Sequence, residues 1–546
     1  MFKAISNQLK EKSWKANNNF LLYCNFITYM INYTLFLFLQ ERTGELLYML
    51  DSMRLSPVRN FIGKEFSYFF IVVSIFFSLT GSSFAGGKEY IQGKIDNLVK
   101  DSYLEGGKFS LYIKVLKRGD IIYDYNSSLS LAPASNMKVL TTAAALSKLG
   151  SNFSFDTNVY GKVQNDTITS DLILYSNGDP TYCVEFYKPP TKVFRSIAQK
   201  LYSMGIRTVK GDVLGDDSFF DRQLRGKGWK EEYQFEAYSA EVSPLSLNEN
   251  VIDLKVSPGK DYYLPGIVTI FPYAGIIEVI NQTKTSETTQ SISVERLKDS
   301  NKIIVSGWIP YDYSCVETYV NVHNPALYTT SAFARILKEE GIKLNGTVRL
   351  IGIPAEIRKK DVCGLLCVHK SPPLPAGISY INKKSDNLSA EMLLKTLGGV
   401  TFGQGSAENG SSVVKDFLRE VGVDTSGLVM ADGSGLSPED RVTSKLLVDV
   451  LSYMYFSPDG KAFVDSFSMA GVDGTLRKRL RGTPAEGNLK GKTGTISGVS
   501  ALCGYVSTSY GQTIVFSILS NDIPEGAAKD AEDRIVQILA SCPEEI

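Results

Sequence analysis

The chain has 546 residues, with 58 Lys and Arg against 58 Asp and Glu, 43% hydrophobic residues and 21% charged residues. These values are typical of globular proteins and exclude a disordered chain, a collagen, a coiled coil and a multispan membrane protein. The zero formal net charge removes the usual argument for a nucleic-acid-binding surface. The sequence contains two histidines, His323 and His369, and this scarcity weakens any mechanism that depends on a histidine base or a histidine metal site.

The first 85 residues contain two apolar segments. Phe20–Leu39 is a run of 20 residues without a charge, which is long enough to span a bilayer. Phe66–Leu79 has 14 residues, follows a basic region that starts at Met53, and precedes the small-residue pattern Ser83-Phe84-Ala85. A basic region, a short apolar run and a small-residue cleavage pattern, in this order, predict a secretory signal peptide.

We therefore expect a leader over residues 1–85, with cleavage after Ala85 and export of a mildly acidic protein. A signal peptide that starts at Met53 makes residues 1–52 an upstream extension of the leader. The alternative is a real membrane anchor at residues 20–39, which would leave the protein attached to the membrane.

A short cysteine pattern follows the middle of the chain. Cys363, Cys367 and His369 have a spacing that hints at metal ligands. However, no second ligand pair follows at the spacing of a zinc finger, so buried thiols or one local disulfide are the favoured interpretation. No metal or other cofactor is predicted.

The segment before residue 155 predicts a strand pair and a helix. Ser110–Leu116 and Ile121–Tyr125 are rich in β-forming residues and flank a Lys-Arg-Gly-Asp turn, which predicts a hairpin. Ser135–Leu149 contains strong helix formers and is followed by Gly150, where a glycine commonly terminates a helix. From Phe153 to about Val368 short strands and turns dominate, and Ser331–Glu340 is one of few predicted helices, so this stretch suggests a β-rich insertion.

After the insertion the helical pattern returns. We predict helices at 387–398, 411–421, 444–455 and 527–540, and strands at 489–495, 499–507 and 512–519. Strands with flanking helices at both ends of the chain favour one α/β domain, residues 86–155 and 375–546, which is split by an insertion at 156–374.

Three short motifs occur in order along this split domain. They are Ser135-Asn-Met-Lys138, Ser385-Asp-Asn387 and Lys492-Thr-Gly494. Each motif alone is weak, because short patterns arise by chance in a chain of this length. The joint signal is strong, because the first opens a predicted helix, the second lies on a loop entering a helix, and the third lies on a strand ahead of a hairpin.

The residue types in the first motif suit nucleophilic catalysis. A serine hydroxyl is a weak nucleophile unless a base lies beside it, and one helical turn places Lys138 on the same face as Ser135. A lysine acts as a base only when its pKa falls, through burial or through a second cation nearby. Lys492 is a candidate for that second cation.

The other motifs suit proton relay and substrate binding. Ser385 would pass a proton to the leaving nitrogen, and Asn387 would hold a substrate amide and keep Lys138 in place. Lys492 and Thr493 would bind a carboxylate, and the strand through Gly494 could pair with an extended peptide. The backbone N–H groups of Ser135 and Thr495 are candidates for an oxyanion hole.

Four other patterns have simpler explanations. Gly487–Thr493 resembles a phosphate-binding loop but has three residues between its glycines where four are needed, and a strand follows it. Asp432-Gly-Ser-Gly435 lacks the Gly-x-Ser-x-Gly pattern and is predicted to be a turn. Gly178-Asp-Pro180 and Asp217 are predicted turn residues, although Asp217 could reach substrate. The histidine spacing is wrong for a metallopeptidase.

The three motifs together are the pattern of penicillin-binding proteins and serine β-lactamases, and six further phrases narrow the resemblance. They are Pro133–Ala145, Ser176–Pro180, Gly211–Phe219, Val242–Asn250, Lys384–Glu391 and Asp432–Ser437. From about residue 90 to its end, the chain resembles the D-alanyl-D-alanine carboxypeptidase/endopeptidase family, the class C low-molecular-mass penicillin-binding proteins.

The resemblance implies a transpeptidase-like catalytic domain, an antiparallel sheet flanked by helices, with two subdomains in the insertion. It also implies a periplasmic enzyme that cleaves D-Ala-D-Ala or other D-amino-acid peptide bonds of peptidoglycan and is acylated by β-lactams. The family pattern makes Ser135, Lys138 and Ser385 the expected catalytic residues. Two alternatives stay open at this stage, a β-lactamase or esterase on the same scaffold and a wall-binding protein that has lost turnover.

Overall fold

The computed structural model describes residues 86–100, 104, 106–351 and 363–546. The predicted leader, including the charge-free segment at 20–39 and the signal peptide at 53–85, lies outside these residues. Within the described ranges, no helix is both long enough and apolar enough to cross a bilayer.

A six-stranded antiparallel sheet combines strands from both ends of the chain. Its order is β18-β19-β20-β21-β1-β2, with the bounds β1 Lys108–Val115, β2 Ile121–Tyr125, β18 Ser468–Met469, β19 Lys490–Ile496, β20 Val499–Ser507 and β21 Thr513–Asn521. Strand β1 pairs with β21 so that Ser110 lies opposite Leu519. The two predicted hairpins are confirmed, with strand ends that differ by at most two residues.

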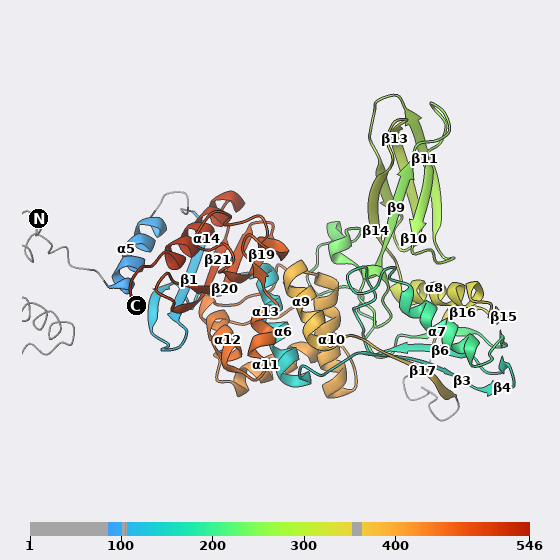
Figure 1. Ribbon diagram of the computed structural model, residues 1–546, viewed down its shortest axis with the longest axis horizontal. Helices are drawn as coiled ribbons and strands as arrows, with labels where there is room; N and C mark the ends of the chain where they lie inside the picture. Colours follow the sequence, from blue (N-terminus) through green and yellow to red (C-terminus); the bar gives the residue numbers. More distant parts are fainter. Residues whose placement is uncertain (1–85, 101–103, 105, 352–362) are drawn as a thin grey trace, which may run out of the picture. The chain divides into compact units, whose positions relative to one another are not determined.

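Alternate residues of the central strands face opposite layers of the domain, as the two-residue period of a strand requires. In β20, Leu502 and Val506 belong to the core beneath α5 (Gly87–Val99) and α14 (Glu525–Ala540). Their neighbours Ala501, Cys503 and Tyr505 belong to the core on the other face. Figure 1 shows α5 and α14 on one side of the sheet and α12 on the other.

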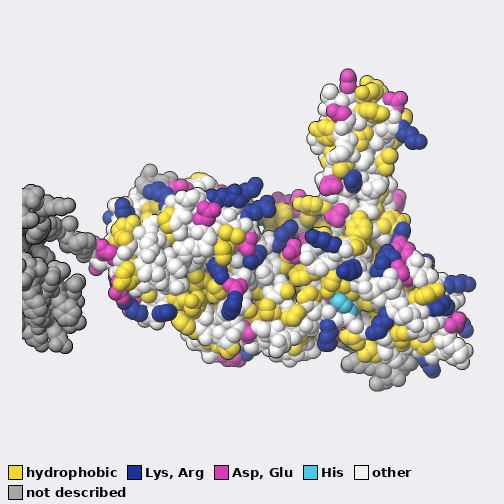
Figure 2. All heavy atoms as spheres, in the orientation of Figure 1, with side chains coloured by type: hydrophobic (Ala, Val, Ile, Leu, Met, Phe, Trp, Pro, Cys, Tyr) yellow, Lys and Arg dark blue, Asp and Glu magenta, His cyan; other side chains and the backbone are white. Residues whose placement is uncertain are grey.

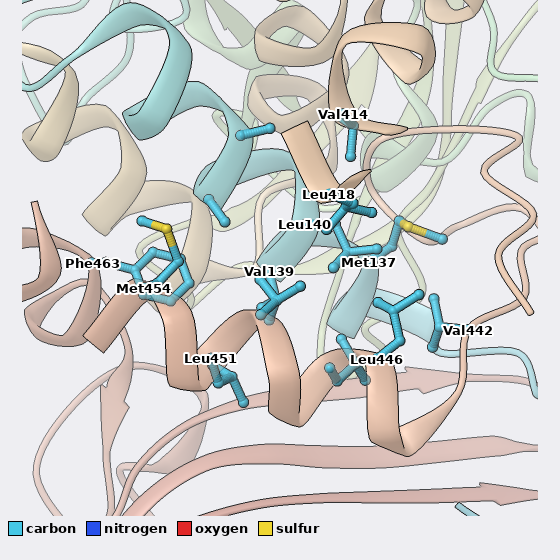
Figure 3. Close-up of a cluster of buried hydrophobic side chains, with 14 of the residues drawn as sticks. Met137, Val139, Leu140, Val414, Leu418, Val442, Leu446, Leu451, Met454 and Phe463 are labelled. Atoms are coloured by element: carbon cyan, nitrogen blue, oxygen red, sulfur yellow. The ribbon is translucent and has the colours of Figure 1, made fainter. Parts of the chain in front are cut away.

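The second face carries a helical layer around a central helix, α6 (Met137–Leu149). The other helices of this layer are α9 Leu374–Lys384, α10 Asn387–Phe402, α11 Ala407–Glu420, α12 Ser444–Phe456 and α13 Gly460–Asp465. Figure 3 shows Met137, Val139 and Leu140 of α6 against side chains of α11 and α12. Every residue of α6 from Met137 to Leu146 is buried, so the helix that carries Lys138 is held from all sides.

In its described residues, 156–351 and 363–374, the insertion has four small sheets and two α-helices. The sheet orders are β16-β8-β6-β3-β17, β15-β7-β5-β4, β10-β9-β14 and β11-β13-β12. The strands are β3 Asp156–Gly161, β4 Val163–Gln164, β5 Thr167–Ile168, β6 Leu172–Ser176, β7 Thr208–Val209, β8 Val213–Asp216, β9 Val251–Ser257, β10 Ile267–Phe271, β11 Glu278–Ser286, β12 Ser293–Arg296, β13 Lys302–Pro310, β14 Val316–Asn321, β15 Lys343–Leu344, β16 Val348–Leu350 and β17 Gly364–Lys370.

The two helices of the insertion, α7 (Lys192–Ser203) and α8 (Pro325–Glu339), share one apolar core with these sheets. The chain leaves α6, enters β3 at Asp156, and returns from β17 to α9, which begins at Leu374. The β-rich insertion into an α/β domain is thus present, whereas its exact limits and its division into two subdomains stay predictions.

Several predicted element boundaries were wrong for local reasons. Ser135 does not begin an α-helix: it lies in a 3-10 turn, Ala134–Asn136, and α6 starts at Met137. Helix α8 begins at Pro325 rather than at Ser331, because the Asn324 side chain caps it by accepting a hydrogen bond from the Leu327 amide at 3.2 Å. Helices α5, α7, α9 and α13 were not predicted.

The six cysteines in the described part of the chain are unpaired thiols, and five are buried. Buried thiols are therefore the outcome for this set, and the local disulfide is not formed. His369 lies against Tyr187, with its Nε2 at 3.2 Å from the phenol oxygen, and no cluster of three metal-ligating side chains occurs among the described residues. On the face drawn in Figure 2, basic and acidic side chains are interspersed.

Candidate active site

Ser135 lies where the strand β19 and the loop Asp432–Ser437 approach the 3-10 turn very closely. A Cβ atom placed on Gly494 of β19 would lie 2.6 Å from the Pro133 carbonyl oxygen and 3.0 Å from the Ser135 amide nitrogen. Ala134 has a positive φ of 45°, an uncommon conformation for a residue with a side chain. Only a glycine at position 494 lets the strand lie this close to the serine, so the turn is fixed by packing.

Lys138 is the base candidate, and its amino group points at the serine. Its Nζ donates hydrogen bonds to Ser135 Oγ at 2.9 Å, to Asn387 Oδ1 at 2.7 Å and to the Ser434 carbonyl oxygen at 2.7 Å. The side chain is 0% exposed. Burial lowers the pKa of Lys138 to about 8, against the opposing effect of nearby carboxylates. A minority of the amine, far larger than for an ordinary lysine, is therefore neutral near physiological pH.

Buried carboxylates lie around the loop Asp432–Ser437, in which the Ser434 carbonyl accepts a hydrogen bond from Lys138. Asp432 accepts from the amides of Gly435 at 2.6 Å and Ser437 at 2.7 Å, and Glu391 of α10 accepts from the Ser434 amide at 2.8 Å. Burial, followed by the charge of Asp432, raises the pKa of Glu391 to about 8. These carboxylates shape the loop and temper the fall of the pKa of Lys138.

Ser385 occupies the joint between α9 and α10, with φ at 63°. This left-handed conformation is rare for residues other than glycine and costs free energy, of order 1–3 kcal/mol. Its hydroxyl accepts a hydrogen bond from Lys492 Nζ at 2.8 Å. Asp386 then caps α10 by accepting from the Ser389 amide at 2.7 Å, so the joint ends one helix and starts the next.

Lys492 is the second buried lysine, with 0% of its side chain exposed. Its Nζ also donates to the carbonyl oxygen of its neighbour Thr493 at 2.8 Å. Burial and then the charge of Lys138 lower the pKa of Lys492 well below its usual value. The charge of Lys138 thus acts on Lys492, whereas the pKa of Lys138 is lowered by burial and not by Lys492, the second cation that the sequence suggested.

The rest of β19 offers a wall for an extended ligand. Thr493 Oγ1 is hydrogen-bonded to Thr475 Oγ1 at 2.8 Å, and Thr495 is exposed. Strand β18 pairs only with Lys490 and Gly491, whereas β20 pairs along the whole of β19. Among the described strands, the edge of β19 from Lys492 onward therefore has no partner, and it can accept a peptide as an added strand.

The insertion contacts this site directly at two points. Asn387 Nδ2 donates to the Tyr238 carbonyl oxygen at 2.8 Å, while its Oδ1 accepts from Lys138. The indole nitrogen of Trp229 donates to Asp432 Oδ2 at 2.8 Å. Tyr238 and Trp229 were not identified from the sequence, because they lie some 150 and 200 positions away from their partners along the chain.

The structure brings all eight predicted catalytic and substrate-binding residues together around β19, α6 and the α9–α10 joint. The predicted turn residues that lie outside this neighbourhood have structural contacts instead. Asp179 accepts from the amide and hydroxyl of Thr181 at 2.8 and 2.7 Å, as a turn residue does. Asp217 is half-buried, and burial raises its pKa. The loop Asp432–Ser437 is a turn, as predicted, but it also supplies the carbonyl that holds Lys138.

The site holds a serine that accepts a hydrogen bond from a buried lysine of low pKa, and a second buried lysine on β19. This arrangement defines a serine hydrolase of the penicillin-binding fold, which works by acyl transfer. The chain belongs to the D-Ala-D-Ala carboxypeptidase 3 (S13) family, whose sequence model matches residues 91–542.

Curated relatives and solved structures agree with this assignment. The chain is 34% identical over 467 residues to a D-alanyl-D-alanine carboxypeptidase of Actinomadura sp. (strain R39), which covers 82% of this chain and 84% of that protein. It is 29% identical over 433 residues to D-alanyl-D-alanine carboxypeptidase DacB of Haemophilus influenzae, covering 77% and 87%. The crystal structure of penicillin binding protein 4 from H. influenzae superposes with a TM-score of 0.69 at 27% identity, covering 82% of this chain and 97% of that chain.

Proposed function

We propose that this protein is a serine-type D-Ala-D-Ala carboxypeptidase that acts on peptidoglycan peptides through an acyl-enzyme on Ser135. The observation that carries the proposal is the contact between Lys138 Nζ and Ser135 Oγ at 2.9 Å, inside a site that lowers the pKa of Lys138 to about 8. The names of the relatives support the substrate class, because the two relatives described above are both named D-alanyl-D-alanine carboxypeptidase.

The acylation step needs a proton transfer from Ser135. Neutral Lys138 accepts the hydroxyl proton while Ser135 Oγ attacks the carbonyl carbon of the penultimate D-Ala. The oxyanion meets the backbone N–H groups of Ser135 and Thr495, and each such donor is worth roughly 10²–10³ in rate. Ser385 gives its proton to the leaving nitrogen and regains one from Lys492, to which it is already hydrogen-bonded.

The terminal carboxylate of the substrate determines how the peptide is oriented in the site. Lys492 and Thr493 bind this carboxylate, and the free edge of β19 pairs with the peptide backbone. When the C–N bond breaks, D-alanine leaves and an ester to Ser135 remains. Before deacylation, Lys138 loses to solvent the proton that it took from Ser135, and Lys492 regains a proton from solvent. Water then attacks the ester and gives a proton to neutral Lys138, which passes it to the departing Ser135 Oγ, so that the shortened peptide is released and the serine hydroxyl is restored.

Labelled penicillin tests the proposal. We expect covalent labelling of the wild-type protein and none of Ser135→Ala, together with release of D-alanine from a muropeptide pentapeptide. Unlabelled wild-type protein would overturn the proposal. Labelling without D-alanine release would favour a wall-binding protein that has lost turnover, and rapid loss of the β-lactam adduct would favour a β-lactamase.

We also propose that the protein is exported to the bacterial periplasm. The support is the basic, apolar and small-residue pattern between Met53 and Ala85. N-terminal sequencing of the protein recovered from the periplasm tests it: a start near Gly86 is expected. Recovery of a chain that retains residues 20–39 in the membrane fraction would instead support the anchored form.

A further inference from the structure

The insertion contacts both helices that meet at the α9–α10 joint. On the α10 side, Asn387 Nδ2 donates to the Tyr238 carbonyl oxygen at 2.8 Å. On the α9 side, the phenol of Tyr380 donates a hydrogen bond to the carboxyl group of Glu249. Ser385, the proton donor of the proposed mechanism, lies between Tyr380 and Asn387 in the sequence.

Glu249 lies at the centre of a turn with an unusual backbone. The consecutive residues Asn248, Glu249 and Asn250 have positive φ angles of 53°, 56° and 55°. Glutamate seldom adopts this left-handed conformation, and even asparagine adopts it mostly as a single residue. Such a conformation persists only where the surrounding contacts impose it, and it is frequent at functional sites. The backbone of this turn therefore points to a functional role for the side chain at its centre.

The two asparagines of the turn are bonded within the insertion. The Asn250 side chain accepts from the Ser246 hydroxyl at 2.9 Å and donates to the Glu241 carbonyl oxygen at 2.8 Å. The Asn248 side chain donates to the carbonyl oxygen three residues ahead at 3.2 Å. These bonds brace the turn, while the side chain of Glu249 reaches out of the insertion to α9.

Tyr380 is held on α9 by its ring as well as by its hydroxyl. The side chain is buried, and its ring lies against Phe186 of the insertion with centroids 5.6 Å apart. Helix α9 ends at Ser385, five residues further on. Five residues of α-helix span only about 7.5 Å, so a contact that fixes Tyr380 also fixes the point at which the chain leaves the helix.

Glu249 also lies close to the charge at the joint. Burial, followed by the charge of Asp386, raises the pKa of Glu249 to about 7, and Lys384 and Asp253 are further charged groups that act on it. The carboxyl group is therefore partly protonated at neutral pH. In this state it avoids the full repulsion of two carboxylates and still accepts the hydrogen bond from Tyr380.

We propose that Glu249 and Tyr380 form a positioning pair, through which the insertion holds the Ser385 hydroxyl on Lys492 and within reach of the departing nitrogen. The inference rests on the proposed function, because it needs Ser385 as the proton donor. The left-handed conformation of Ser385 costs free energy, which contacts elsewhere must offset. Without the pair, the joint relaxes and the hydroxyl loses the position that proton transfer needs.

Two substrates separate the positioning of Ser385 from damage to the whole site. The terminal D-alanine of a pentapeptide leaves as an amine and must gain a proton. An analogue with D-thiolactate in place of this D-alanine keeps the carboxylate but leaves as a thiolate, which needs no proton. Both substrates acylate Ser135 with Lys138 as base, so kcat/KM for the analogue reports the rest of the site.

The variants are Glu249→Ala, Tyr380→Phe, the two combined, and Glu249→Gln. Tyr380→Phe keeps the ring against Phe186 and removes only the hydroxyl, so it tests the bond even where Glu249→Ala fails to fold. Glu249→Gln keeps an oxygen that accepts from Tyr380. Tyr123→Phe is the matched control, because Tyr123 of β2 donates to Asp96 of α5 at 2.7 Å in a tyrosine–carboxylate bond of the same kind.

We expect Glu249→Ala and Tyr380→Phe each to lower kcat/KM for D-alanine release by roughly tenfold to a hundredfold, with less than about a threefold change for the thiolactate analogue. The double variant should lose no more than the weaker single variant, because both changes remove one bond. Glu249→Gln should recover most of the rate that Glu249→Ala loses. Tyr123→Phe should match the wild-type protein on both substrates.

An equal fall for the two substrates would overturn the inference, because the pair would then only maintain the fold of the site. So would wild-type D-alanine release by Tyr380→Phe, losses that multiply in the double variant, or a Glu249→Gln protein as slow as Glu249→Ala. Failure of the proposed function looks different, because the wild-type protein would then show neither penicillin acylation nor D-alanine release.

Discussion

Lys492 Nζ lies 2.8 Å from Ser385 Oγ, and this contact joins the strand β19 to the joint between α9 and α10. Neither residue is near the other in sequence, since 107 positions separate them. The contact places a buried amine of lowered pKa beside the hydroxyl that protonates the leaving group in the proposed mechanism. In that mechanism it links the carboxylate-binding strand to the proton relay.

Replacement of Ser385 tests this relay. Ser385→Ala should lower D-alanine release by roughly 10²–10⁴, the range of one acid–base catalyst, and should slow acylation by penicillin. Ser412→Ala, at an exposed serine of α11, is the matched control and should leave both rates near those of the wild-type protein. Steady-state kinetics with a pentapeptide measures the effect, and a wild-type rate in Ser385→Ala would exclude the relay.

The pH dependence of acylation should report Lys138. Only the neutral amine accepts a proton, and burial lowers its pKa to about 8. The acylation rate should therefore fall about tenfold per pH unit well below pH 8 and level off above it. Stopped-flow labelling with a fluorescent penicillin between pH 5 and 10 measures the profile. A rate that does not change between pH 6 and 9 would contradict the assignment of Lys138 as the base.

The same profile should move when Asp432 loses its charge. Asp432 raises the pKa of Lys138 against the larger effect of burial, so Asp432→Asn should shift the acid limb of the acylation profile to lower pH. The replacement also puts an amide group in place of the carboxylate that accepts a hydrogen bond from the Trp229 indole N–H. We therefore expect a lower melting temperature. An acid limb that stays in place or moves to higher pH would show that this carboxylate does not act on the base.

The contact between β19 and the 3-10 turn can be tested at Gly494. A Cβ atom there would meet the Pro133 carbonyl oxygen at 2.6 Å, so Gly494→Ala should cost about 1–3 kcal/mol of stability and slow acylation at least tenfold. Gly93→Ala is the control. Gly93 is exposed in α5 with open space around its Cβ position, and alanine there should add about 0.5–1 kcal/mol. Chemical denaturation and penicillin labelling measure both effects.

Local patterns in the sequence were sufficient for five of the six strands of the sheet, all but the two-residue β18, and for most C-terminal helices. They failed for helices whose signal in the sequence is an isolated capping residue or a short amphipathic face. Asn324-Pro325 is a capping pattern that predicts the start of α8, and it was missed. The helix expected at Ser135 starts two residues later because Gly435 and Gly494 pack against Ala134 and force the chain into a tight turn.

The sequence by itself determined which residue types could perform acyl transfer, because serine, lysine and a carboxylate-binding strand motif have a fixed order along the chain. It could not determine how Lys138 is held. The Ser434 carbonyl, Asp432, Trp229 and Tyr238 reach the site only through contacts between segments that are distant in the sequence. Only the folded chain removes water from the two lysines, and this burial, a property of tertiary packing, turns an ordinary ammonium group into a base.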